Sequence, residues 1–212
     1  AVCMMLSVLP VGAFAAEPRA AEPENGVSAQ KETKPYPLKG GETVNDKFVE
    51  ANGDVYELSG PYTKSITVDT TKNDVTLNIV GNVDVNMGSA LLNVKDARDL
   101  KINAGQHEVV AKVENRDAAA FMNLNASSAT VVVQNGRYLD GEQQRLSFFT
   151  VVAGTLKLND VYIAAKKTTF PILNGSEVYI NGGDLTTEGY RMVYNAPWPW
   201  AGIEKAGTVI ID

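Results

Sequence analysis

The chain has 212 residues, of which 44% are hydrophobic, 8% aromatic and 21% charged. Its 25 acidic and 19 basic side chains give a formal net charge of −6, which argues against nucleic acid or an anionic membrane as a partner. One histidine and one cysteine exclude zinc fingers, His-cluster metal sites and an internal disulfide. No run approaches the roughly 20 apolar residues of a transmembrane helix. No motif for a metal or an organic cofactor is present, so no cofactor is expected.

The first segment has the character of an export signal. Residues 2–15 are apolar or small, carry no charge, and end in Ala13-Phe14-Ala15 before Ala16, which is typical of a signal-peptidase site. We expect residues 1–16 to be a signal peptide with a truncated start, and the protein to be secreted or held at a bacterial cell surface. A short buried helix is the alternative, which Pro10 and Gly12 disfavour.

Residues 17–45 are rich in proline, glutamate and lysine and nearly free of branched apolar side chains. Such a stretch buries too little surface to offset its ordering entropy. We therefore expect a flexible linker over 17–45 and a folded domain over 46–212.

From about residue 54 onward, short β-rich runs alternate with turns. Six occurrences of a four-residue pattern, apolar, any, apolar, then an amide or acid, can be aligned, and their third positions lie 25, 31, 25, 22 and 31 residues apart. Repetition of this kind is typical of a β-solenoid, in which turns stack about 4.8 Å apart. The six matches begin at Val75, Leu100, Val131, Leu156, Val178 and Val209.

Alternation along a strand places the first and third positions of the pattern on the inner face. The third positions predict one buried apolar column: Leu77, Ile102, Val133, Leu158, Ile180 and Ile211. The fourth positions predict a structural ladder of amides at the strand-ending turn: Asn78, Asn103, Gln134, Asn159 and Asn181, with Asp212 after them. Glycines that follow predict turns with positive φ: Gly81, Gly105, Gly136, Gly182 and Gly183.

A second apolar strand follows each pattern, as in residues 90–94 and 120–124, so two strands per repeat are expected. Together these features predict an all-β fold, a right-handed parallel β-helix of about six rungs. We expect the helix to be incomplete at its C-terminus, because the last pattern stops at Asp212. An antiparallel β-sandwich, which also has short strands and frequent turns, is the alternative.

The clearest unit joins Ile180-Asn181-Gly182-Gly183-Asp184 to Tyr190-Arg191-Met192-Val193-Tyr194-Asn195. In this pattern, residues 54–212 resemble the right-handed parallel β-helices of bacterial surface proteins, which are pectin-lyase-like in fold. The resemblance implies an adhesin or passenger-type domain. It is specific for the fold and weak for function.

Some enzymes of this fold act on acidic polysaccharides, so we searched the outward columns for catalytic groups. A glycosidase needs two carboxylates about 5–9.5 Å apart, which neighbouring rungs of one column would supply. In neither the column two residues after the third residue of each pattern nor the column four residues after it do two carboxylates lie on neighbouring rungs. Arg137 and Asp184 share a column two rungs apart, and with the lone His107 they are expected to be solvated surface residues. No catalytic residue is assigned.

Both tryptophans of the chain, Trp198 and Trp200, lie beside prolines in residues 195–201, with Tyr190 and Tyr194 close in sequence. Exposed aromatic faces bind sugar rings or other proteins, so these four residues are the ligand-binding candidates. A loop folded back over the last rungs is the alternative.

The expected function is a secreted or cell-surface, non-enzymatic adhesive scaffold or stalk that binds carbohydrate, with a surface glycan or a host or partner protein as its ligand. The alternative is an acidic-polysaccharide lyase or glycoside hydrolase whose catalytic site lies on rungs outside this sequence. A phage tail-spike-like fibre is a third possibility, which the signal peptide disfavours.

Overall fold

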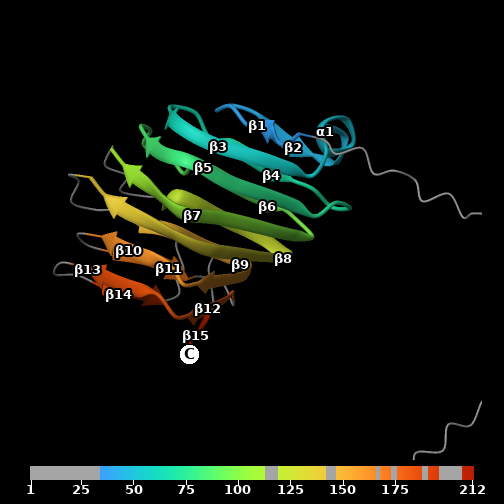
Figure 1. Cartoon of the computed structure of the whole chain (residues 1–212). Coiled ribbons are helices and arrows are strands. Elements are labelled where there is room, and N and C mark those ends of the chain that lie inside the picture. The colour runs from blue at the N-terminus through green and yellow to red at the C-terminus, as the bar shows by residue number, and fades with distance from the viewer. Residues whose placement is uncertain are drawn as a thin grey trace, which may run out of the picture. The chain divides into compact units, whose positions relative to one another are not determined.

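The chain folds as a parallel β-solenoid with almost no helix (Figure 1). The computed structural model describes residues 34–112, 119–141, 147–165, 168–172, 176–187, 191–195 and 207–212. Every strand pair among these residues is parallel. The parallel β-helix prediction is therefore confirmed, and the antiparallel sandwich is wrong.

The strands stack into three ladders, which we call faces A, B and C. Face A consists of residues 36–37, 55–58, 75–78, 99–103, 130–134, 155–159, 177–181 and 208–211. Face B consists of residues 60–62, 83–85, 108–111, 137–140, 162–165 and 184–187. Face C consists of residues 43–45, 66–69, 92–96, 119–125, 147–153, 168–172 and 191–195. Long strands bend at the corners and contribute to two faces, or to all three in the case of residues 119–140, so a turn of the solenoid visits A, then B, then C. The expectation of two strands per repeat is therefore wrong. It missed face B, whose strands are short and follow the first strand after a brief bend. The strands are β1 (Tyr36–Pro37), β2 (Thr43–Asn45), β3 (Val55–Tyr62), β4 (Ile66–Asp69), β5 (Val75–Val85), β6 (Leu92–Asp96), β7 (Asp99–Ala111), β8 (Ala119–Asp140), β9 (Ser147–Asn159), β10 (Tyr162–Ala165), β11 (Thr168–Ile172), β12 (Glu177–Asn181), β13 (Asp184–Thr187), β14 (Arg191–Asn195) and β15 (Thr208–Ile211).

The predicted core column exists on face A. Strand pairing places its six residues opposite one another in order along the stack. The first five are buried, whereas Ile211 is in register but 68% exposed. The same column continues on the other side to Tyr56 and Tyr36, which the pattern search missed because tyrosine fills the inward position there.

The interior at the middle of the stack is aromatic. Tyr138 lies among Phe121, Phe148 and Phe149, with ring centroids 5.0, 6.1 and 5.3 Å away, in edge-to-face arrangements. All four side chains are fully buried. The Tyr138 hydroxyl has no hydrogen-bond partner among the described residues, and burial raises the pKa of this phenol. The unpaired hydroxyl of Tyr138 therefore lowers the stability of the core.

The folded domain begins before the predicted boundary at residue 46. Strands β1 and β2 already pair with β3 and β4, so residues 36–45 are not a linker. The short helix α1 (Asp46–Asn52) follows β2 directly, with the Asn45 side chain accepting a hydrogen bond from the Phe48 N–H at 2.9 Å. Phe48 lies 5.4 Å from Tyr36 and 5.8 Å from Tyr56 between ring centroids. The helix thus covers the aromatic start of the core, at the blue end of Figure 1.

The corner between faces A and B has left-handed backbone on successive turns. Gly105, Asn135, Asp160 and Gly182 have φ of 55°, 58°, 52° and 68°. Asparagine and aspartate tolerate this conformation better than other side chains do. The positive-φ prediction is confirmed at Gly105, Gly136, Gly182 and Gly183 and is wrong at Gly81. At Gly183 a Cβ atom would also collide with the backbone of Val161 on the preceding turn, so close packing adds to the need for glycine.

Candidate functional site

The aromatic candidates fall largely outside the described part of the chain. Trp198, Trp200 and Tyr190 lie outside the described residues. Tyr194 belongs to β14, where its backbone pairs with Pro171 of β11. The ligand-binding assignment of these four residues therefore stays a prediction.

The predicted amide ladder lies on the outward side of face A. Strand pairing sets Asn78 opposite Asn103, Asn103 opposite Gln134, Gln134 opposite Asn159, and Asn159 opposite Asn181. The Asn181 amide donates to the Asn159 carbonyl at 2.8 Å, and the Asn103 carbonyl accepts from the Gly105 N–H at 3.2 Å. Asn159 and Asn181 thus join two neighbouring turns, and Asn103 holds the backbone of the corner. Glu57 stands opposite Asn78 at the next position of the column.

A row of charged and aromatic side chains crosses face B. Glu108, Arg137, Tyr162 and Asp184 stand opposite one another on successive turns. The Arg137 guanidinium lies 3.6 Å from the Glu108 carboxylate and 5.0 Å from the centre of the Tyr162 ring. The shared column of Arg137 and Asp184 is thus confirmed. Gln106 is the residue that an unbroken count from Ile102 would set opposite Arg137, but a register shift between Gly105 and Glu108 brings Glu108 to that position instead.

Face C carries a pair of carboxylates on neighbouring turns, Asp69 and Asp96. The expectation that no outward column holds such a pair is therefore wrong. Asp96 also accepts a hydrogen bond from the Ser128 hydroxyl at 3.2 Å. Residues 66–69 obey the same apolar, any, apolar, acid rule as the six matches on face A, so a signal was present in the sequence. It was missed because the search counted columns from face A alone.

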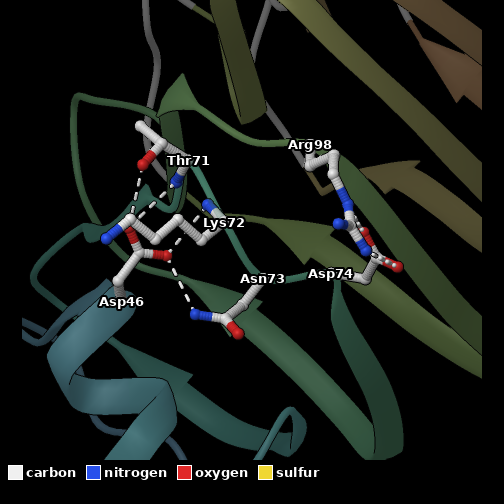
Figure 2. Close-up of polar contacts among 6 residues, drawn as sticks. All are labelled: Asp46, Thr71, Lys72, Asn73, Asp74 and Arg98. Atoms are coloured by element: carbon white, nitrogen blue, oxygen red, sulfur yellow. Dashed lines mark hydrogen bonds and ion pairs between the residues drawn. The ribbon is translucent and has the colours of Figure 1, made fainter.

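Asp46, in the first turn of α1, binds the bend that follows β4 (Figure 2). Its carboxylate accepts hydrogen bonds from the Thr71 hydroxyl at 2.9 Å, the Thr71 N–H at 3.3 Å, the Lys72 N–H at 3.1 Å and the Asn73 amide at 3.0 Å. Partial desolvation opposes ionisation of Asp46, but these donors outweigh it and lower the pKa. The carboxylate thus fastens the helix to the following turn.

Ion pairs join neighbouring turns in the same way. Arg98 binds Asp74 with two parallel hydrogen bonds of 2.7 and 2.8 Å, also drawn in Figure 2. This contact lowers the pKa of Asp74 and raises the pKa of Arg98. Lys112 lies 3.6 Å from Asp84 on the preceding turn.

A shallow hollow of about 390 Å³ lies beside β3, near the start of face B. Its lining includes the exposed lysines Lys39 and Lys64 and the buried Tyr62. The Tyr62 hydroxyl donates to the Leu38 carbonyl at 3.0 Å, and burial raises the pKa of this phenol.

Within the described ranges, no three His, Cys, Asp or Glu side chains are grouped to hold a metal ion. The helix described here is too short to cross a membrane. Comparison of the chain with protein-family models, with characterised proteins and with solved structures finds no match.

Proposed function

We propose that the protein is a secreted or cell-surface scaffold, a stiff, non-enzymatic stalk of the bacterial adhesin type that presents a carbohydrate-binding or protein-binding loop. The observation that carries the proposal is the direction of the side-chain contacts. Among the described residues, most side-chain hydrogen bonds and ion pairs on the outer faces join residues 22 to 32 positions apart, which is one turn of the solenoid.

Contacts of this spacing run along the solenoid axis. The Asn123 amide donates to Asn93 at 3.3 Å on face C, as Asn181 does to Asn159 on face A. The Lys157 ammonium lies 5.7 Å from the centre of the Tyr179 ring on the next turn. Each bond is weak on its own, but a series along one axis resists bending and separation of the turns. Axial cohesion is what a stalk requires.

Secretion of the protein and a right-handed, pectin-lyase-like β-helix are part of the same proposal. The Ala13-Phe14-Ala15 pattern supports secretion. Parallel strands joined by crossovers within one sheet are almost always connected with right-handed sense, which supports a right-handed β-helix of the pectin-lyase-like kind. The ligand would be a surface glycan or a host protein, contacted through Trp198 and Trp200.

Binding of the intact chain to a glycan array tests the adhesive part of the proposal. We expect Trp198→Ala with Trp200→Ala to weaken binding at least tenfold while leaving the melting temperature unchanged. Tyr179→Ala, which removes an aromatic ring from face A, is the matched control and is expected to bind as the parent does. Equal binding by the tryptophan variant, or no binding by the parent, would contradict this part.

A second candidate function is a polysaccharide hydrolase, which the Asp69 and Asp96 pair favours. Carboxylates on adjacent strands, about 4.8 Å apart along the stack, lie near the separation that retaining glycosidases use. Asp69→Asn or Asp96→Asn would abolish turnover if this pair were catalytic. On the scaffold proposal both variants behave as the parent does.

A further inference from the structure

The start of face B differs from the starts of faces A and C. Faces A and C begin with β1 and β2, whereas face B begins one turn later, with residues 60–62 of β3. Among the described residues, these three pair only with residues 83–85 of β5. The preceding segment, residues 38–41, bonds to the backbone of this turn at its two ends. The Leu38 N–H donates to the Glu57 carbonyl, and the Gly41 N–H donates to the Ser65 carbonyl. The hollow of about 390 Å³ lies between these two points.

A strand edge of this kind is where a further strand would add, including one from a second copy of the chain. Its capacity to pair depends on which backbone groups face outward. The Tyr62 carbonyl accepts from the Asn86 N–H, so the groups of Tyr62 face the next turn. Since backbone groups alternate along a parallel strand, the groups of Pro61 face away from β5, on the side of the hollow.

Ser59 and Pro61 both line the hollow, and neither offers a free backbone donor. Pro61 has no N–H. The Ser59 N–H is already bound by the Tyr62 hydroxyl at 3.4 Å. Lys39 and Lys64, both exposed, line the hollow and would bring like charges together if two copies approached this edge. Proline and lysine are the residues with which natural sheets protect their edges.

We infer that residues 59–64 form a protected strand edge, which prevents the solenoid from pairing through the start of face B with a second copy of itself. Pro61 has no N–H to donate, and the Tyr62 hydroxyl already accepts the N–H of Ser59. Lys39 and Lys64 would repel the same two lysines of a second copy. The inference concerns self-association alone and holds whatever ligand the protein binds.

The molar mass of the intact chain, measured by light scattering after gel filtration over a hundredfold range of concentration, tests this inference. The parent is expected to keep the mass of one copy. Pro61→Val with Lys39→Thr and Lys64→Thr restores the donor and removes the charges, so its mass should rise toward two copies as the concentration increases. Lys47→Thr, an exposed lysine of α1 that does not line the hollow, is the matched control and should stay at one copy.

Lys39→Thr with Lys64→Thr, which keeps Pro61, is a second variant that changes only exposed side chains. It is expected to fold as the parent does, as judged by circular dichroism and melting temperature, and to dimerise less than the triple variant. The inference is overturned if the folded triple variant keeps the mass of one copy at every concentration. If the triple variant does not fold, a one-copy mass for the lysine variant overturns it. A parent that dimerises through cross-links at Lys39 or Lys64 would also overturn it.

Discussion

Single side chains in this solenoid differ in whether their polar atoms are satisfied, and two tyrosines illustrate the contrast. Tyr138 and Tyr62 are both buried, but the Tyr62 hydroxyl bonds to the Leu38 carbonyl while the Tyr138 hydroxyl has no partner in the described structure. A buried hydroxyl without a partner costs about 1–3 kcal/mol, whereas a bonded one contributes about 1 kcal/mol. Removing the two hydroxyls should therefore have opposite effects.

We expect Tyr138→Phe to raise the free energy of unfolding by about 1 kcal/mol, because the ring stays among the phenylalanines and an unpaired polar atom is lost. Tyr62→Phe should lower it by about 1 kcal/mol. Urea unfolding of both variants and the parent checks this. A loss of stability in Tyr138→Phe would mean that its hydroxyl has a partner, such as a bound water.

Tyr56 makes stability depend on alkaline pH. Burial and the nearby Asp54 carboxylate raise the pKa of Tyr56 to about 12, against an unfolded value of 10.0. The stabilisation is complete below pH 10, because both states are then protonated, and it is lost between pH 10 and 12 as the unfolded state ionises first. Two pKa units correspond to a loss of about 3 kcal/mol. Tyr56→Phe should reduce the slope of stability against pH over this range, and an unchanged slope would contradict the assignment.

At the scale of the strand, the sequence specifies face A well and the other faces poorly. Leu77, Ile102 and Val133 follow strict alternation, so their register could be predicted from the pattern alone. Face B was missed because its strands span only a few residues beyond a bend, and α1 because seven residues are too few for a helical period. The pairing of Glu108 with Arg137 does not follow from counting along the sequence, because a register shift set by local backbone geometry precedes Glu108.

The core column of face A gives a direct test of register. Ile102→Asp or Leu158→Asp buries an unpaired charge and should prevent folding, whereas Lys101→Asp, one position away on the outer side, should change stability by less than about 0.5 kcal/mol. Circular dichroism and solubility of the three variants distinguish these outcomes. Equal tolerance of aspartate at Ile102 and Lys101 would contradict the inward placement of Ile102.

Helix α1 depends on Asp46 for its attachment to the bend after β4. Asp46→Ala removes four hydrogen bonds and should lower the melting temperature, since the backbone N–H of Lys72 loses its partner. Asp46→Asn keeps one carbonyl acceptor and should lose less. Thermal unfolding of both variants checks the order, and equal losses would show that the charge, rather than the acceptor geometry, holds the helix.

For the molecule as a whole, the ladders of faces A, B and C place side-chain contacts along one axis. The amides of face A, the Glu108 and Arg137 pair of face B and the Asn93 and Asn123 pair of face C each join one turn to the next. A scaffold uses its polar groups in this way. An enzyme instead keeps some of them directed at a substrate, and the Asp69 and Asp96 pair is the place to look for that behaviour.

The measurement that separates scaffold from enzyme most directly is turnover of acidic and neutral polysaccharides by the intact chain. Unsaturated product is read by its ultraviolet absorbance and hydrolysis by new reducing ends, with the heat-denatured chain and Asp69→Asn as controls. The scaffold proposal predicts no product above the denatured control from any polysaccharide, including those that bind. Product formed by the parent and lost in Asp69→Asn would contradict it and assign the catalytic site to face C.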